Sequence, residues 1–196
     1  MDHFDFNNIE FNPHSHITHT ECVGHITEKV HSINKHLTQF FFTAELITVA
    51  AEPRGEDFVI SKKQLQITLG NKKREAIIIR TLPNFTDKKN MQYSHTNPPY
   101  MTEEAAIYLR EKGIKHLLID LPSIDKEKDG GELLAHNAFW NTNEDIRLDA
   151  TITEFIYVAN NKGLLSYNGS KWYLYPTPNQ SIMRSVLAQG ERIYSG

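Results

Sequence analysis

Hydrophobic and polar residues are patterned along the chain in a way that predicts a mixed α/β protein. Uninterrupted runs of β-branched, aromatic and aliphatic residues, bounded by Gly, Pro and polar clusters, indicate strands. The expected strands cover residues 40–50, 55–60, 76–82, 115–121, 171–175 and 181–188, and residues 150–158 are expected to form a strand or a strand–helix junction. The third of these runs stops at Pro83, which has no N–H to donate to a ladder.

Three segments have the features of helices. Apolar residues at spacings of three and four predict a short helix over 26–37. A second helix is expected over 103–112, because Thr102 is a good N-cap, two glutamates follow it, and Gly113 is a natural stop. A third, over 131–140, follows a Gly-Gly pair. The helix at 103–112 and the apolar strand after it form an α/β unit.

The length of 196 residues suits one domain with one core, and we expect a single domain over residues 1–196. The pattern lacks the regular alternation of a doubly wound nucleotide-binding sheet, and no glycine-rich phosphate loop is present in the sequence. The expected fold class is therefore α/β, mixed and rich in β structure.

Composition narrows the range of partners. The formal net charge is −3, so a nucleic-acid partner is not expected. The short basic runs Lys62-Lys63 and Lys72-Lys73-Arg74 are interpreted as solvated turns. The most apolar stretch, 40–51, is too short for a membrane span, and the N-terminus lacks the features of a signal peptide, so we expect a cytoplasmic protein. The single cysteine, Cys22, excludes an intrachain disulfide.

Histidine is distributed unevenly. Of the ten histidines, four lie within the twelve residues from His14 to His25, and the other 184 residues hold six. Neutral imidazole is the commonest protein ligand of metal ions, so this clustering is the first functional signal. Five of these six (His3, His31, His36, His95 and His116) are interpreted as having no such role.

In an extended segment, His19, Glu21 and His25 share a face, because side chains alternate along a strand. Two imidazoles and a carboxylate on one face suit a divalent transition metal. His25 lies four residues beyond Glu21 and reaches the same ion only if the chain turns, and Gly24 permits a turn there. Cys22 alternates to the opposite face and is interpreted as a small buried packing residue.

Four segments, in order along the chain, resemble the motifs of the cyclase family, which includes kynurenine formamidase. Residues 18–25, Thr-His-Thr-Glu-Cys-Val-Gly-His, are similar to the signature His-x-Gly-Thr-His-x-Asp-x-Pro-x-His. Residues 119–125, Ile-Asp-Leu-Pro-Ser-Ile-Asp, resemble a strand that ends in Asp-x-Pro-Ser-x-Asp. Ala135-His136 and Ile152-Thr153-Glu154 resemble the later histidine and glutamate of the family. The resemblance implies a β-rich, swivelling β/β/α domain.

The resemblance also implies a set of functional residues. It assigns His19 and Glu21 as metal ligands, His25 as a proton-transfer group near the metal, and His136 and Glu154 as the residues that complete the site. The position of the first signature histidine is Ser15 in this chain. His14 and His16 flank it, and we favour His14 as the remaining ligand because it leaves more space before His19.

The chain departs from the signature in other ways as well. Ile17 replaces the glycine, Glu21 the aspartate and Val23 the proline. Members of the family usually carry a further strand region before the signature, so we expect a short variant of the domain or a chain that starts at an internal methionine. Of the two aspartates in 119–125, Asp120 is a candidate for orienting a histidine, whereas Asp125 is explained equally well by turn chemistry.

The function that the resemblance implies is metal-dependent hydrolysis of an amide or lactam-like C–N bond by an activated water, with His25 moving the proton. The expected cofactor is Zn²⁺ or Mn²⁺, the expected substrate is a small aromatic amide such as an N-formyl arylamine, and the expected assembly is a homodimer. The alternative is a catalytically silent member of the same fold that binds a metal or a small ligand.

Overall fold

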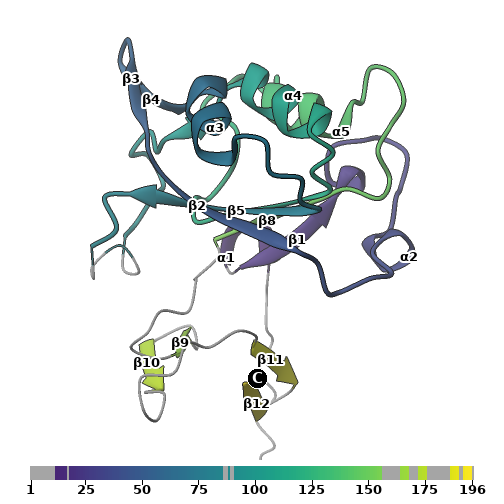
Figure 1. Ribbon diagram of the computed structural model, residues 1–196, viewed down its shortest axis with the longest axis vertical. Helices are drawn as coiled ribbons and strands as arrows, with labels where there is room; N and C mark the ends of the chain where they lie inside the picture. Colours follow the sequence, from purple (N-terminus) through teal and green to yellow (C-terminus); the bar gives the residue numbers. More distant parts are fainter. Residues whose placement is uncertain are drawn as a thin grey trace, which may run out of the picture. The chain divides into compact units, whose positions relative to one another are not determined.

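The computed structural model describes residues 12–16, 18–85, 88 and 91–155, and four strands between residues 164 and 195. The chain divides into two compact units, Met1–Ile156 and Tyr157–Gly196. Each unit is described by itself below, and the elements of both are labelled in Figure 1. The expected single domain over 1–196 stays a prediction.

A five-stranded mixed sheet forms the centre of the first unit. Its strand order is β1-β8-β7-β5-β2. The strands are β1 (His19–Cys22), β2 (Ala44–Ala50), β5 (Ala76–Leu82), β7 (His116–Ile119) and β8 (Thr151–Glu154). β2, β5, β7 and β8 run parallel, whereas β1 pairs antiparallel with β8. The N-terminal strand is therefore joined to the last strand of this sheet.

A second, smaller sheet contains β3 (Glu52–Arg54), β4 (Asp57–Ile60) and β6 (Tyr100–Met101). β3 and β4 form an antiparallel hairpin, and β6 pairs parallel with β4. The turn of the hairpin contains Gly55 at φ +66°, a conformation that glycine adopts without steric cost. The expected strand at 55–60 is thus found at residues 57–60, and the strand at residues 52–54 was not foreseen.

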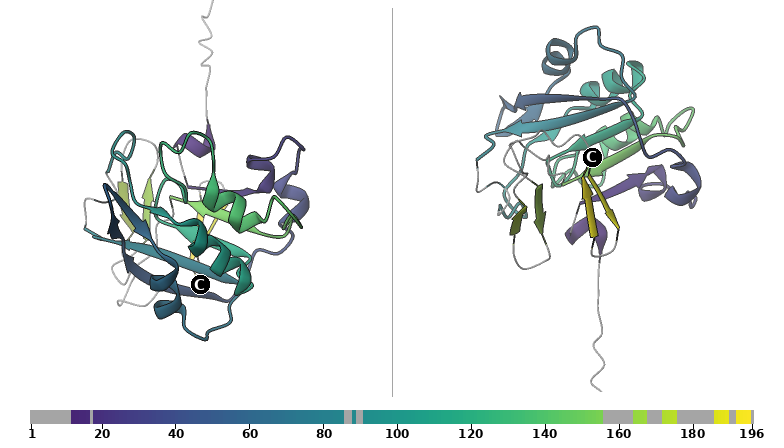
Figure 2. Two further views of the ribbon diagram at one scale, coloured as in Figure 1. Left: turned by 90° about the horizontal axis from the view of Figure 1, so that it is seen from above. Right: turned by 60° about the horizontal axis from the view of Figure 1, so that its bottom comes forward.

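Three helices cover one face of the five-stranded sheet, as Figures 1 and 2 show. They are α3 (Lys62–Leu69), α4 (Glu103–Glu111) and α5 (Leu134–Trp140). Two single-turn helices, α1 (Pro13–His16) and α2 (Ile33–His36), and the 3₁₀ turn η1 (Val23–His25) belong to the N-terminal part of the unit.

The core lies between these helices and the central strands. Ile77 and Ile79 of β5 and Leu117 and Ile119 of β7 are fully buried and pack with Leu109 of α4. Parallel strands covered by helices have this continuous aliphatic character, which is why the periodicity at 76–82 and 115–121 identified them. The mixed α/β architecture confirms the fold class expected from the sequence.

Helix α4 confirms the sequence prediction in detail. The Thr102 hydroxyl accepts a hydrogen bond from Ala105 N at 3.3 Å, and Gly113 has φ +79° just beyond the helix. Helix α3, in contrast, was missed. Lys62 and Lys63 begin this helix and do not form a turn, and Ser61 and Gln64 form a reciprocal capping box ahead of the buried Leu65.

The prediction of a helix over 26–37 is wrong for most of its length, because only Ile33–His36 is helical. Val30 is 87% exposed, so the apolar spacing does not correspond to a buried face. The Thr27 hydroxyl donates to the carbonyl oxygens of Val23 and Lys29, and these local bonds replace those of a helix.

The turn after β1 returns the chain toward the sheet. Residues Val23–His25 form η1, and a Cβ atom on Gly24 would lie 2.1 Å from the carbonyl oxygen of His31. The Cys22 thiol donates to this same oxygen at 3.2 Å, and Cys22 is buried as expected. The turn that the sequence required at Gly24 is present, and glycine is needed there because another segment of backbone lies against it.

The second unit contains two antiparallel strand pairs. They are formed by β9 (Leu164–Tyr167) with β10 (Trp172–Tyr175) and by β11 (Val186–Gln189) with β12 (Arg192–Ser195). Residues 172–175 of the strand expected at 171–175 form β10, and residues 186–188 of the strand expected at 181–188 belong to β11, whereas residues 171 and 181–185 lie outside the described residues. Within the described residues, no helix is long and apolar enough to cross a membrane.

Replacing Gly24 with alanine should destabilise the first unit, because the new methyl group cannot occupy the position of the His31 carbonyl. We expect the free energy of unfolding to fall by about 1–3 kcal/mol, the usual cost of overpacking. Urea unfolding followed by tryptophan fluorescence measures it. Lys29→Ala, an exposed change in the same turn, is the control and should stay within about 0.5 kcal/mol of the parent. Equal unfolding midpoints for Gly24→Ala and the parent would show that the close approach has no energetic effect.

Candidate metal centre

The pairing of β1 with β8 places three polar side chains on one face of the sheet. His19 lies opposite Glu154 in the antiparallel register, and Glu21 lies two residues along β1 on the same face as His19. Glu21 and Glu154 are 4% and 5% exposed. His19 Nε2 lies 3.6 Å from Glu21 Oε2 and 3.7 Å from Glu154 Oε2, so the imidazole stands between the two carboxylates.

His136 reaches the same carboxylates from helix α5. Its Nε2 lies 3.0 Å from Glu21 Oε1 and 3.7 Å from Glu154 Oε1. The imidazole is almost fully buried, and its ring centroid lies 5.3 Å from that of Trp140, one turn further along the helix. The buried part of the site is therefore formed by three separate elements: β1, β8 and α5.

His14 and His25 complete the cluster on its solvent side. His14 Nδ1 lies 3.1 Å from Glu21 Oε2, and His25 Nε2 lies 3.5 Å from the same oxygen. The two rings stack with centroids 4.0 Å apart and planes inclined by 17°. Their side chains are 41% and 34% exposed. The turn at η1 is what returns His25 to Glu21.

All six residues that the sequence nominated as functional therefore lie in one cluster, with Glu21 at its centre. Glu21 Oε2 accepts no hydrogen bond from the described residues, although three imidazole nitrogens lie within 3.6 Å of it. Two sets of donors satisfy the geometry of a metal site: His14, His19 and Glu21, and Glu21, His136 and Glu154. The side chain of His16, the other candidate for the first position, lies outside the described residues.

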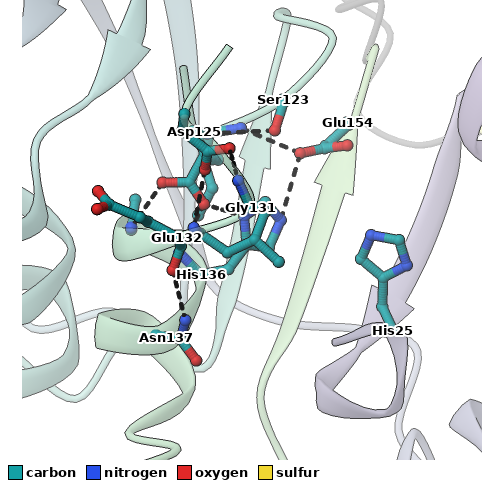
Figure 3. Close-up of polar contacts among 12 residues, drawn as sticks. His25, Ser123, Asp125, Gly131, Glu132, His136, Asn137 and Glu154 are labelled. Carbon is teal, nitrogen blue, oxygen red and sulfur yellow. Dashed lines mark hydrogen bonds and ion pairs between the residues drawn. The ribbon is translucent and has the colours of Figure 1, made fainter. Parts of the chain in front are cut away.

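The turn after β7 makes hydrogen bonds to Glu154 and His136, the two members of the cluster that come latest in the chain, as Figure 3 shows. Ile124 N donates to Glu154 Oε1 at 3.1 Å. Asp125 Oδ2 lies 2.5 Å from His136 Nδ1, and its carboxylate also accepts hydrogen bonds from the backbone N–H groups of Ala135 and His136, at 2.7 and 3.2 Å. From the sequence, Asp125 was explained equally well by turn chemistry, although the motif Asp-x-Pro-Ser-x-Asp contains it.

Asp120, the aspartate considered for orienting a histidine, has other partners. Its carboxylate accepts hydrogen bonds from the backbone N–H and the hydroxyl of Thr81, at 3.0 and 2.8 Å, and from Lys88 Nζ at 2.7 Å. These contacts join the end of β7 to the end of β5. Asp120 therefore stabilises neighbouring strands, and it is Asp125 that contacts a histidine of the cluster.

Burial and the neighbouring charges shift the pKa values of the buried groups in different directions. Burial raises the pKa of Glu154 to about 8, and the negative charge of Glu21 acts in the same direction. Burial alone would lower the pKa of His136, but hydrogen bonds to Asp125 and Glu21 outweigh it and raise this pKa to about 10. Burial would likewise raise the pKa of Glu21, but the hydrogen bond and charge of His136 hold it below its ordinary value.

His25 differs from His136 in its surroundings. Burial is the largest influence and lowers the pKa of His25, and the charge of Glu21 only partly opposes it. A lowered pKa favours the neutral imidazole at pH 7, which has one nitrogen free to accept a proton.

The chemistry of this donor set fits a divalent metal ion. Two buried carboxylates within reach of one another repel, and neutral imidazoles and carboxylates are the donors that Zn²⁺ and Mn²⁺ bind. A cation among them would offset that repulsion and bind Glu21 Oε2. No thiol belongs to either set of donors, and Cys22, on the other face of β1, does not contribute.

The chain belongs to the Cyclase family, whose model, described as "Putative cyclase", matches residues 1–126. The match contains the histidine-rich segment and the turn with Asp125, and it ends before His136 and Glu154. Comparison with curated proteins gives no match.

Three solved structures share the fold. One, described as a "potential metal-dependent hydrolase with cyclase activity", is 17% identical with a TM-score of 0.51 over 76% of this chain and 65% of its own. A "predicted metal-dependent hydrolase" from Bacillus stearothermophilus is 18% identical (TM-score 0.50; 76% and 63%). Isatin hydrolase A from Labrenzia aggregata, bound to benzyl benzoate, is 14% identical (TM-score 0.51; 78% and 63%). This chain thus spans 63–65% of the length of these three proteins.

In the metal-free protein, replacing Glu154 with glutamine should increase stability. The amide keeps an oxygen for Ile124 N and removes a carboxyl group whose pKa is raised to about 8, so that folding at pH 7 no longer has to protonate a group that is ionised in the unfolded chain. We expect a gain on the order of 1 kcal/mol at pH 7, equivalent to about 2–4 °C in Tm. Calorimetry in the presence of a chelator measures it. The matched control is Glu132→Gln, an exposed glutamate ahead of α5, which should leave Tm unchanged. A lower Tm for Glu154→Gln than for the parent would mean that the two carboxylates do not repel in the metal-free state.

Proposed function

We propose that this protein is a metal-dependent hydrolase that cleaves the C–N amide bond of a small aromatic substrate, as an arylformamidase does. The observation that carries the proposal is the convergence of four imidazoles and Glu154 on Glu21, with one oxygen of Glu21 accepting no hydrogen bond from the described residues. Membership of the Cyclase family supports the reaction class, and the names of the structurally similar hydrolases agree with it.

The proposed metal ligands are His14, His19, Glu21, His136 and Glu154. They divide into the two donor sets described above, which share Glu21. Zn²⁺ and Mn²⁺ both suit imidazole and carboxylate donors. A bound divalent cation would supply Lewis acidity, which lowers the pKa of water and polarises a carbonyl group.

His25 is the proposed proton-transfer residue. Its side chain is 34% exposed, so it can face a substrate that approaches from solvent, while its Nε2 stays 3.5 Å from Glu21. Buried His136, in contrast, is surrounded by carboxylates and has no exposed edge for a substrate. A histidine at the rim, with a pKa lowered by burial, is suited to take a proton from water and donate it to a leaving nitrogen.

The substrate class rests on two observations from relatives. The family resemblance points to N-formyl arylamines, and one similar structure is an isatin hydrolase, named for an aromatic lactam. Both substrates contain a carbonyl carbon bonded to an aryl nitrogen. We therefore propose an aryl amide or lactam, with His25 protonating the nitrogen as the bond breaks.

A homodimer in the cytoplasm remains part of the proposal. β2 is the last strand of its sheet among the described residues, and Phe40 and Phe41 just before it are 71% and 81% exposed. An exposed apolar segment beside an open strand edge is a suitable contact for a second copy of the chain.

The purified protein should contain about one or two divalent ions. Chelation should lower Tm and added Zn²⁺ or Mn²⁺ should restore it, because a ligand that binds only the folded state stabilises it. Elemental analysis and thermal melts with and without chelator are the measurements. His36→Ala, which changes a half-buried histidine of α2 outside the cluster, should keep the parent's metal content. A metal-free protein whose melting curve does not respond to either ion would exclude the proposed function.

Replacing His25 and His19 with alanine should separate proton transfer from metal binding. His25→Ala should keep its metal and lose about 10²–10⁴-fold in turnover of an N-formyl arylamine or an aryl lactam. His19→Ala should lose metal and activity together, because it removes a buried donor between two carboxylates. The measurements are metal content and steady-state kinetics on the same preparations. Loss of metal from His25→Ala to the same extent would make His25 a ligand.

The same assays test the alternative of a catalytically silent family member. The observation that favours it is the altered signature, with Ser15 and Glu21 where the family has histidine and aspartate. A parent protein that binds metal but turns over no formamide or lactam, with or without added Zn²⁺ or Mn²⁺, would support this alternative.

A further inference from the structure

We propose that Asp125 is a positioning residue that fixes the proton of His136 on Nδ1 and so keeps Nε2 facing the metal ion. The inference rests on the proposed function, since it assumes that His136 binds a metal. It assigns a role to a residue that belongs to neither set of metal donors and that turn chemistry explained equally well from the sequence.

Both oxygens of the Asp125 carboxylate accept hydrogen bonds. Oδ1 accepts the backbone N–H of Ala135 at 2.7 Å, and Oδ2 accepts the backbone N–H of His136 at 3.2 Å. Oδ2 also lies 2.5 Å from Nδ1 of the His136 ring. A carboxylate only accepts hydrogen bonds, so the ring nitrogen that faces it must carry a proton. The other nitrogen, Nε2, lies 3.0 Å from Glu21 Oε1 and 3.7 Å from Glu154 Oε1, so in the metal-free protein it carries a proton too, and a metal ion bound there would take the place of that proton while the one on Nδ1 stays.

The position of Asp125 is fixed by its own backbone and by its burial. Asp125 is 7% exposed, and its N–H donates to the hydroxyl of Ser123 at 3.2 Å. Helix α5 begins after Leu133, whose side chain makes no cap, so the carboxylate takes the first N–H groups of the helix in place of a cap. His136 is the third residue of this helix, and the same carboxylate therefore sets both the helix start and the ring orientation.

The short turn that carries Asp125 also contacts Glu154 and the end of β8. Ile124, the residue before Asp125, donates its N–H to Glu154 Oε1 at 3.1 Å. Phe155 N donates to the carbonyl oxygen of Leu121 at 3.0 Å, which ties the end of β8 to the same turn. Residues 121–125 thus position two proposed ligands that lie on different elements, as Figure 3 shows for His136 and Glu154.

Asparagine at position 125 would reverse the tautomer of the ring. If its oxygen keeps the bond to Ala135 N, its NH₂ group faces Nδ1 of His136 as a donor. The neutral ring then accepts at Nδ1 and carries its proton on Nε2, where no lone pair remains for a cation. If the amide turns the other way, the NH₂ group opposes the N–H of Ala135. Neither arrangement reproduces the parent site.

The experiment measures Zn²⁺ affinity by competition with a chromophoric chelator for the parent, Asp125→Asn and Asp120→Asn. Asp125→Asn should bind Zn²⁺ about 10–100-fold more weakly, the usual effect of losing a carboxylate that orients a ligand histidine. Asp120→Asn is the matched control, because Asp120 is also a hydrogen-bonded aspartate near a strand end but contacts Thr81 and Lys88 instead of an imidazole. Its Zn²⁺ affinity should stay within threefold of the parent, by our order-of-magnitude estimate of about 0.6 kcal/mol or less.

A double-mutant cycle with His136→Ala distinguishes positioning from a purely structural role. Asp125→Asn should have no further effect on Zn²⁺ affinity when His136 is absent, because the residue acts through that ring. Equal losses in both backgrounds would overturn the proposal. Parent-like affinity in a folded Asp125→Asn variant would also overturn it, while leaving the proposed function intact. A parent that binds neither Zn²⁺ nor Mn²⁺ would overturn both.

A measurement on the parent protein does not depend on whether the variants fold. In ¹⁵N-labelled, Zn²⁺-loaded protein, the imidazole correlations of His136 should show the proton on Nδ1 and the metal on Nε2. Comparison with His136→Gln assigns the signals. A proton on Nε2 of the loaded protein would overturn the proposal.

Discussion

The antiparallel pairing of β1 with β8 is the interaction on which the candidate metal centre depends. The pairing sets His19 opposite Glu154 and puts Glu21 on the same face, although the two strands are far apart in the sequence. If the pairing register of one strand shifted by one residue, the side chains of that strand that now face the cluster would point to the opposite face of the sheet. β8 in turn is held in parallel by β7, whose aliphatic side chains are buried under the helices. The apolar core around β7 thus holds β8 in place, and β8 in turn sets the register of β1, which carries His19 and Glu21.

The cluster brings several ionisable side chains together in a buried place, where they are not needed to stabilise the fold. Glu21 and Glu154 are buried together, and the pKa of Glu154 is raised to about 8 as a result. Buried carboxylates of this kind reduce the stability of a metal-free protein and favour the binding of a cation. The neighbouring residues are arranged accordingly: His136 lies between Asp125 and Glu21, and His14 and His25 stack at the rim. The site is therefore buried at His136 and Glu154 and partly exposed at His14 and His25.

Glu21 distinguishes this chain from the family signature, which has aspartate at this position. The longer side chain reaches His136 through one oxygen and the N-terminal histidines through the other. The first histidine of the signature is replaced as well, by Ser15, and the exposed ring of the neighbouring His14 stacks on that of His25. The two departures therefore occur at neighbouring points of one cluster.

The sequence alone determined the elements with strong local signals, and it nominated the candidate site residues that the fold brings together. The aliphatic runs of β5 and β7, the Thr102 cap of α4, and the clustered histidines with their distant partners could all be identified from the sequence. It failed where local patterns were ambiguous: the apolar spacing at 26–37 predicted a helix that the exposed Val30 does not support, and the capping box at Ser61 was overlooked. Only the tertiary structure decided that Asp125 and not Asp120 contacts His136, because both aspartates lie in one turn and their side chains reach different elements. It also decided that Gly24 is needed for the close approach of His31, since contacts between distant segments have no periodicity that a sequence could display.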